Sequence, residues 1–150
     1  MSETMHIRPT RTGDSVQEGE ELPPLEVHIT TSRIVATAIA SRDFMPVHHD
    51  RDFAQSQGSK DVFMNILTSS GFTGRYATDW AGPEAMIKKI AIRLGAPNYP
   101  GDVMRMTGIV TGKTRVGPDT EVEIAVRGAN GLGDHLTGTV VVSLPDQATT

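Results

Sequence analysis

The feature that most constrains the fold is a change of hydrophobic period at Gly82-Pro83. Before it, small and apolar residues recur at helical spacing from Ile66 to Trp80, which predicts one long helix. After it, apolar and polar residues alternate in four segments separated by turn residues, which is typical of strands with one buried face. The predicted inward residues are Ile90, Ile92 and Leu94; Met104, Met106 and Gly108; Val122, Ile124 and Val126; and Val140, Val142 and Leu144.

The predicted long helix has an unusually small inward face, which suits close approach to a sheet. Its members are Ile66, Leu67, Ser70, Gly71, Gly74, Ala77 and Ala81. A single antiparallel sheet with this helix on its concave face gives an α+β layout. The opposite face of the sheet would stay partly exposed, so we expect dimerisation through strand edges or helices.

Shorter elements are expected ahead of the long helix. Residues 1–21 are polar, charged and without periodicity, which predicts a flexible tail, and Leu22-Pro23-Pro24-Leu25 marks entry into a domain over residues 22–150. A strand is predicted over Glu26 to Ile29. A helix over Arg33 to Ala40 follows the capping residues Thr30, Thr31 and Ser32, with inward residues Ile34, Val35, Ala38 and Ile39. Another helical segment runs from Asp50 to Gln57 and stops at Gly58.

Composition excludes several classes of protein. The 150 residues suit one domain, and the absence of cysteine excludes disulfides and thiolate metal sites. The net charge is -4 and the basic residues are scattered, so no nucleic-acid partner is expected. No apolar run approaches the roughly 20 residues that cross a bilayer. The first residues also lack the apolar core of a secretory signal, so we expect a cytoplasmic protein.

The strongest chemical signal is Asp43-Phe44-Met45-Pro46-Val47-His48-His49-Asp50. Pro46 fixes its own φ and moves Met45 toward extended geometry, so the segment bends instead of continuing a helix. A carboxylate at Asp43 and an imidazole at His48 could then face one point, hold a water molecule and move its proton. The structural alternatives are a capping carboxylate at Asp43 and a backbone-bonded histidine at His48.

The neighbours of this pair have other expected roles. Adjacent side chains diverge, so His49 is expected at the surface or lining a substrate. Three consecutive residues cannot easily converge on one ion, so no metal site is predicted, and Asp50 suits a helix N-cap. Four residues near the end of the long helix could line a pocket or a partner surface, although packing and capping explain them more simply: Arg75, Tyr76, Asp79 and Trp80.

The motif and its element order resemble the MaoC-like hot-dog hydratases and dehydratases, whose pattern is G-D-x-N-P-[LIV]-H followed by an acidic residue and a short helix containing Ala. Here the pattern runs from Arg42 to Asp50, with Ala54 downstream, and the resemblance covers roughly residues 22–144. The form D-F-M-P-V-H-H-D, with Arg75-Tyr76-Ala77-Thr78-Asp79-Trp80, is most similar to the small catalytic subunit of actinobacterial steroid side-chain hydratases. That subunit pairs with a second MaoC-like chain that lacks the catalytic motif.

This resemblance implies hydration of a 2-enoyl-CoA thioester, as in cholesterol side-chain degradation. Asp43 and His48 would hold the attacking water. Backbone N–H groups at Asn65 and Ile66, at the start of the long helix, would receive the charge on the thioester oxygen. No cofactor is implied, because CoA is part of the substrate. The implied partner is a second MaoC-like subunit in a heterodimer or heterotetramer, and a homodimer is the alternative.

The chain departs from the family pattern at two positions. Met45 stands where the family has an asparagine, and a thioether has no amide donors. Its unbranched, polarizable side chain would instead give an apolar wall to a bulky substrate such as a steroid. Met64-Asn65 stands where relatives carry His-Gly. The backbone N–H of Asn65 could still stabilise the thioester oxygen, although its side chain leaves less space than glycine does. Two other functions stay open: a hydroxyacyl-carrier-protein dehydratase subunit of fatty-acid elongation, and a non-catalytic hot-dog scaffold.

Overall fold

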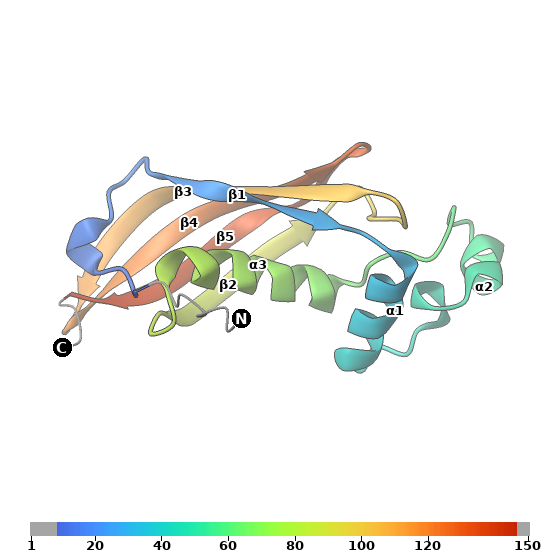
Figure 1. Cartoon of the computed structure of the whole chain (residues 1–150), viewed down its shortest axis with the longest axis horizontal. Coiled ribbons are helices and arrows are strands. Elements are labelled where there is room, and N and C mark those ends of the chain that lie inside the picture. Colours follow the sequence, from blue (N-terminus) through green and yellow to red (C-terminus); the bar gives the residue numbers. More distant parts are fainter. Residues whose placement is uncertain (1–8, 147–150) are drawn as a thin grey trace, which may run out of the picture.

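A five-stranded antiparallel sheet holds one long helix against its inner face. The computed structural model describes residues 9–146, and its strands are β1 (Glu21–His28), β2 (Met86–Leu94), β3 (Val103–Val116), β4 (Asp119–Asn130) and β5 (Gly133–Pro145). The strands lie in the order β1-β3-β4-β5-β2. Helix α3 (Ile66–Ala81) lies along the sheet, while α1 (Thr31–Ala40) and α2 (Arg51–Ser56) project beyond its N-terminal end (Figure 1). The predicted α+β layout is confirmed.

The core lies between α3 and the inner face of the sheet. Most strand residues predicted to face inward are fully or almost fully buried: Met104, Met106, Val122, Ile124, Val126, Val140, Val142 and Leu144. The inward residues of β2 pack against this core but are only partly buried, because β2 is an edge strand: Ile90, Ile92 and Leu94. Gly108 lets α3 approach β3, since a Cβ atom there would lie 2.9 Å from the Tyr76 ring.

The buried face of α3 differs in part from the predicted one. Three predicted positions are buried: Gly74, Ala77 and Ala81. The prediction was wrong for three exposed positions, Ile66, Leu67 and Gly71, and Ser70 is half-buried. The first half of the helix instead buries Thr68, Ser69 and Thr73. The Thr73 hydroxyl donates to the Ser69 carbonyl at 2.8 Å, so its burial leaves no unpaired group, and apolar periodicity cannot reveal such positions.

The N-terminal part of the fold begins earlier than predicted. Strand β1 starts at Glu21 and includes Pro23 and Pro24, which an edge strand tolerates where its register shifts, here between Leu22 and Leu25. The predicted domain boundary at residue 22 was too late, because Val16 is fully buried. Val16 directly follows a single 3-10 turn, η1 (Gly13–Ser15), and so short an element has no periodicity to detect in the sequence. The rest of the predicted tail, residues 1–8, lies outside the described residues.

The short helices follow their predicted caps. The Thr30 hydroxyl accepts from the Arg33 N–H at 3.1 Å and starts α1. The predicted inward residues Ile34 and Ala38 are buried, but Ile39 is exposed, because α1 projects from the sheet and only a narrow face is covered. Asp50 caps α2 as predicted, since its carboxylate accepts from the Phe53 N–H at 3.0 Å. No helix between residues 9 and 146 has the length and apolarity to span a membrane.

Candidate active site

Backbone bends after α1 bring Asp43 next to His48. Helix α1 ends with Arg42 in the left-handed region, at φ +59°, and the Asp43 N–H donates to a carbonyl of the last turn at 2.9 Å. This is a common way for a helix to end. Met45 is extended before Pro46, and Pro46 opens the 3-10 helix η2 (Pro46–His48). The chain therefore folds back between residues 43 and 48.

Asp43 and His48 form a carboxylate–imidazole pair. Asp43 Oδ2 lies 3.4 Å from His48 Nε2. His48 Nδ1 lies 2.7 Å from the carbonyl oxygen of Phe63, which can only accept, so Nδ1 carries a proton. The Phe63 ring also meets the His48 ring edge-to-face, with centroids 5.0 Å apart, and His48 is only 7% exposed. The imidazole is thus held in one tautomer and one orientation, with Nε2 facing the carboxylate.

This geometry suits the activation of water. One water molecule beside the pair can lie within hydrogen-bond distance of both Asp43 Oδ2 and His48 Nε2. The neutral imidazole can then accept a proton at Nε2, while the carboxylate orients the water and stabilises the imidazolium that forms. In residues 9–146, no group of three or more His, Cys, Asp and Glu side chains could hold a metal ion.

Asn65 joins this pair to α3. Its Oδ1 accepts from the Thr68 N–H at 3.0 Å and caps the helix, while its Nδ2 donates to Asp43 Oδ2 at 2.9 Å and to Ser41 Oγ at 3.0 Å. The hydrogen bond from Asn65 is the largest cause that lowers the pKa of Asp43 below its usual value. The Met45 N–H and the positive charge that His48 carries when it is protonated act in the same direction, and partial burial opposes them. Asp43 is therefore an anion at neutral pH.

The remaining predicted site residues surround the pair to different extents. The side chain of Met45 is 56% exposed and that of Ile66 is 50% exposed. Their neighbours Phe44 and Leu67 are also exposed, so apolar side chains at the surface follow both Asp43 and Asn65 in the chain. His49 is exposed at the end of η2, and within the described part of the chain its side chain makes no hydrogen bond or ion pair. The backbone N–H groups that begin α3 have no acceptor inside the helix. The predicted oxyanion role of Asn65 and Ile66 stays a prediction.

Sequence reasoning missed two residues that hold the site together. Ser41 accepts from Asn65 and donates from its hydroxyl to the Thr37 carbonyl at 2.8 Å, which ties the end of α1 to the start of α3. Phe63 holds His48 through its main-chain carbonyl. A main-chain contact leaves no signal in residue type, and a serine at a helix end is too common to single out.

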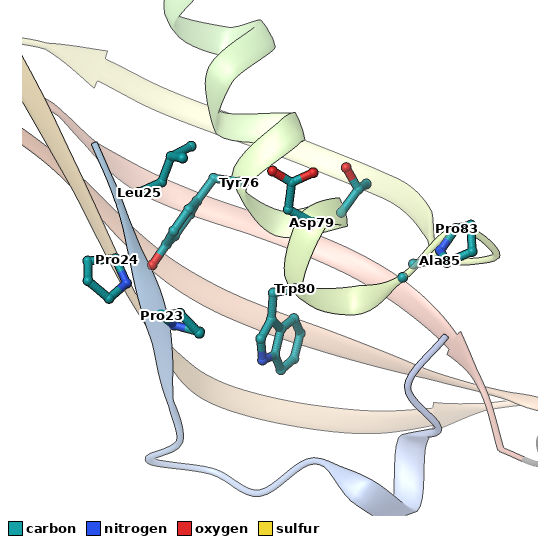
Figure 2. Close-up of a pocket in the computed structure, with 10 residues that line it drawn as sticks. Pro23, Pro24, Leu25, Tyr76, Asp79, Trp80, Pro83 and Ala85 are labelled. Carbon is teal, nitrogen blue, oxygen red and sulfur yellow. The ribbon is translucent and has the colours of Figure 1, made fainter. Parts of the chain in front are cut away.

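A separate groove lies at the other end of α3. It has a volume of about 770 Å³ and contains three of the four residues singled out near the helix end, Tyr76, Asp79 and Trp80. Figure 2 shows the Tyr76 and Trp80 rings on the side formed by α3, with Pro23 and Pro24 on the β1 side. Tyr76, the residue of α3 in the groove that is nearest to the start of the helix, lies about 15 Å along the helix from Ile66. The groove is therefore too distant to hold a group that reacts at Asp43.

Comparison with known proteins agrees with this architecture. A family model described as MaoC like domain matches residues 14–130. The 3-oxo-4,17-pregnadiene-20-carboxyl-CoA hydratase beta subunit of Mycobacterium tuberculosis is 50% identical over 128 residues, which are 85% of this chain and 96% of that protein.

Solved structures give the same result. The ChsH1-ChsH2 complex from Mycobacterium tuberculosis contains a chain that is 49% identical, with a TM-score of 0.80 over 85% of this chain and 98% of that one. The (R)-hydratase from A. caviae involved in PHA biosynthesis has a TM-score of 0.76 over 89% of this chain and 100% of that one, at 24% identity, and supports the hot-dog fold alone. The chain belongs to the family of MaoC-like domain proteins.

Proposed function

We propose that this chain is the catalytic subunit of a heteromeric enoyl-CoA hydratase that acts on the unsaturated side chain of a steroid. The observation that carries the proposal is the contact between Asp43 Oδ2 and His48 Nε2, with Nδ1 of His48 fixed by a carbonyl. The substrate class follows from the relative that is 50% identical and is named 3-oxo-4,17-pregnadiene-20-carboxyl-CoA hydratase beta subunit, because pregnadiene is a steroid skeleton. The reaction needs no cofactor, because CoA belongs to the substrate, and we place it in the cytoplasm.

The proposed reaction adds water across the C2–C3 double bond of the thioester. Asp43 orients the water, and His48 Nε2 takes its proton as the oxygen bonds to C3. The displaced electron pair moves to C2 and the thioester oxygen, where the N–H groups at Asn65 and Ile66 stabilise the charge. His48 then returns the proton to C2. One molecule of water has been added, and both side chains are back in their starting protonation states.

The apolar surroundings of the pair support a bulky, apolar acyl group. Exposed apolar side chains flank both Asp43 and Asn65: Phe44, Met45, Ile66 and Leu67. Complete burial of an exposed side chain of this kind is worth about 1.5–3 kcal/mol, and these side chains are about half exposed, so each could contribute about half of that. A fused-ring acyl group, together with the facing surface of a partner, would cover them and exclude water from the reacting atoms.

The sheet edges indicate where a second MaoC-like chain would pair. Pro23 and Pro24 interrupt β1, so this edge strand has two residues without a backbone donor. Strand β2 has no proline, and its exposed residues Met86 and Ile87 lie on the other edge. We therefore place the partner along β2, where strand pairing could continue the sheet.

Activity of the purified pair tests the proposal. The chain would be co-expressed with a second MaoC-like chain, and loss of the unsaturated thioester absorbance would be followed with steroid side-chain and linear enoyl-CoA substrates. We expect the steroid substrate to be hydrated, and Asp43→Asn and His48→Ala to lower kcat by about 10²–10⁴-fold. Thr30→Ala, which loses a cap of α1 away from the pair, is the control for reduced stability.

Other outcomes lead to other functions. Full activity in Asp43→Asn would reject the assigned roles. Turnover of a carrier-protein thioester but not of the CoA thioester would indicate a hydroxyacyl-carrier-protein dehydratase. Hydration that depends on the partner but not on Asp43 or His48 would indicate a scaffold subunit, and a homogeneous, active preparation of this chain alone would indicate a homodimer.

A further inference from the structure

We propose that Asn65 is a positioning residue, which fixes the Asp43 carboxylate toward His48 and ties that orientation to the capped start of α3. The inference rests on the proposed function of Asp43, because Asn65 acts through that carboxylate. It goes beyond the expected main-chain role of this position, since the side chain makes the contacts.

The Asn65 amide is fully engaged. Asn65 is only 3% exposed. One amide hydrogen goes to Asp43 Oδ2 and the other to Ser41 Oγ, while Oδ1 accepts from the Thr68 N–H. The side chain therefore has a single arrangement that satisfies all its polar groups, and a buried amide held in this way cannot turn freely.

The contact with Asp43 is directional. Asn65 Nδ2 binds Oδ2, which is the oxygen that faces His48 Nε2. The other oxygen, Oδ1, accepts from the Met45 N–H at 3.2 Å. The carboxylate is thus held at both oxygens, and loss of the Asn65 contact would free the oxygen that is closest to the imidazole.

The same contact favours the charged form of Asp43. A hydrogen bond donated to a carboxylate stabilises the anion, and here it is the largest cause of the lowered pKa of Asp43. Removal of the donor therefore raises the pKa of Asp43. If the anion is the active form, the acid limb of the kcat/KM profile moves to higher pH.

Two variants separate positioning from helix capping. Asn65→Asp keeps the shape and the oxygen that caps Thr68, because Asp and Asn are equally good N-caps, but it removes both donors and adds a like charge beside Asp43. Asn65→Ser also keeps a capping hydroxyl, but its shorter side chain does not reach Asp43 Oδ2. We expect kcat to fall by about 10–100-fold in Asn65→Ser. The acid limb of the kcat/KM profile should move to higher pH in both variants, and further in Asn65→Asp.

Titration of Asp43 gives a readout that does not depend on turnover. The side-chain carboxyl ¹³C resonance would be followed against pH in the full chain, in the wild type, both Asn65 variants and Thr30→Ala. Higher Asp43 pKa values in the Asn65 variants, with an unchanged value in Thr30→Ala, would support the proposal even if the enoyl-CoA substrates were wrong. An unchanged Asp43 pKa in folded Asn65→Ser and Asn65→Asp would overturn it and leave Asn65 as a helix cap only.

Discussion

Protonation of His135 is expected to destabilise the fold as the pH falls below 6.5, the usual pKa of histidine. His135 lies on β5 and is 1% exposed. Its Nδ1 donates to the Ala96 carbonyl at 2.7 Å, so Nε2 of the neutral ring accepts from the Ser69 hydroxyl at 2.8 Å. A second proton on the ring, at Nε2, would prevent Nε2 from accepting the hydrogen bond of Ser69 and would place a positive charge in the core. Burial accordingly lowers the pKa of His135.

The size of the effect follows from proton uptake by the unfolded chain. Because the pKa of His135 is lower in the folded state, the unfolded state binds more protons between the two pKa values, and the free energy of unfolding falls as the pH falls. One proton of difference is worth about 1.4 kcal/mol per pH unit. Lowering the pH from about 7.5 to about 5.5 passes the unfolded pKa and should remove up to about 1.4 kcal/mol. Urea unfolding at both pH values, followed by circular dichroism, measures this loss.

The variant His135→Gln provides the comparison. It removes the titrating ring and keeps an amide that can face Ser69, so it should be less stable at every pH but lose less stability between the two pH values. The carboxylates with lowered pKa values, Glu20 and Asp43 among them, lose their contribution only below about 4.5, outside this range. An equal pH dependence in the wild type and in His135→Gln would refute the assignment to His135.

Four glycine-related changes should alter stability, each measured as a change in the urea midpoint. Arg42→Gly should stabilise the fold by about 1 kcal/mol, because φ is +59° at this position and glycine adopts it without strain; no gain would contradict that backbone angle. Gly71→Ala should stabilise α3 by about 0.5–1 kcal/mol, since a Cβ there meets nothing within 4 Å, whereas Gly74→Ala should gain less because its Cβ would lie 3.1 Å from Ile87. Gly138→Ala should destabilise the fold by about 1–3 kcal/mol, because its Cβ would lie 2.0 Å from the Ala91 carbonyl oxygen. An unchanged urea midpoint in this variant would contradict the pairing of β2 with β5.

The order of elements could be predicted because each one carries a local pattern. The four C-terminal strands alternate clearly, and Thr30, Asp50 and Gly82 mark helix ends by their own chemistry. The predictions were wrong where contacts with other parts of the chain decide whether a residue joins a strand or is buried. Pro23 and Pro24 belong to a strand only because β1 is an edge, and Ser69 and Thr73 are buried only because their hydroxyls find acceptors.

The contact between Asp43 and His48 was predictable from the sequence, but the residues that support it were not. Asp43 and His48 could be paired because Pro46 bends the short segment that carries both. Asn65 is 22 positions away from Asp43 in the chain, and its side chain caps a helix and binds the carboxylate at once. Sequence separation of this kind hides the contact, because only the packing of α1 against the start of α3 brings the two residues together.

Both members of the pair depend on one short segment ahead of α3, residues 63–65. Phe63 holds His48 through its carbonyl and ring, and Asn65 holds Asp43 through its amide. Met64, between them, is buried, and its N–H donates to the carbonyl of the buried Asn98 at 3.1 Å. Residues 63 and 65 of this segment therefore contact the site, while residue 64 lies in the core. The segment is anchored at Met64 to the loop between β2 and β3, so the packing of Met64 in the core helps to position the two residues that hold the carboxylate and the imidazole.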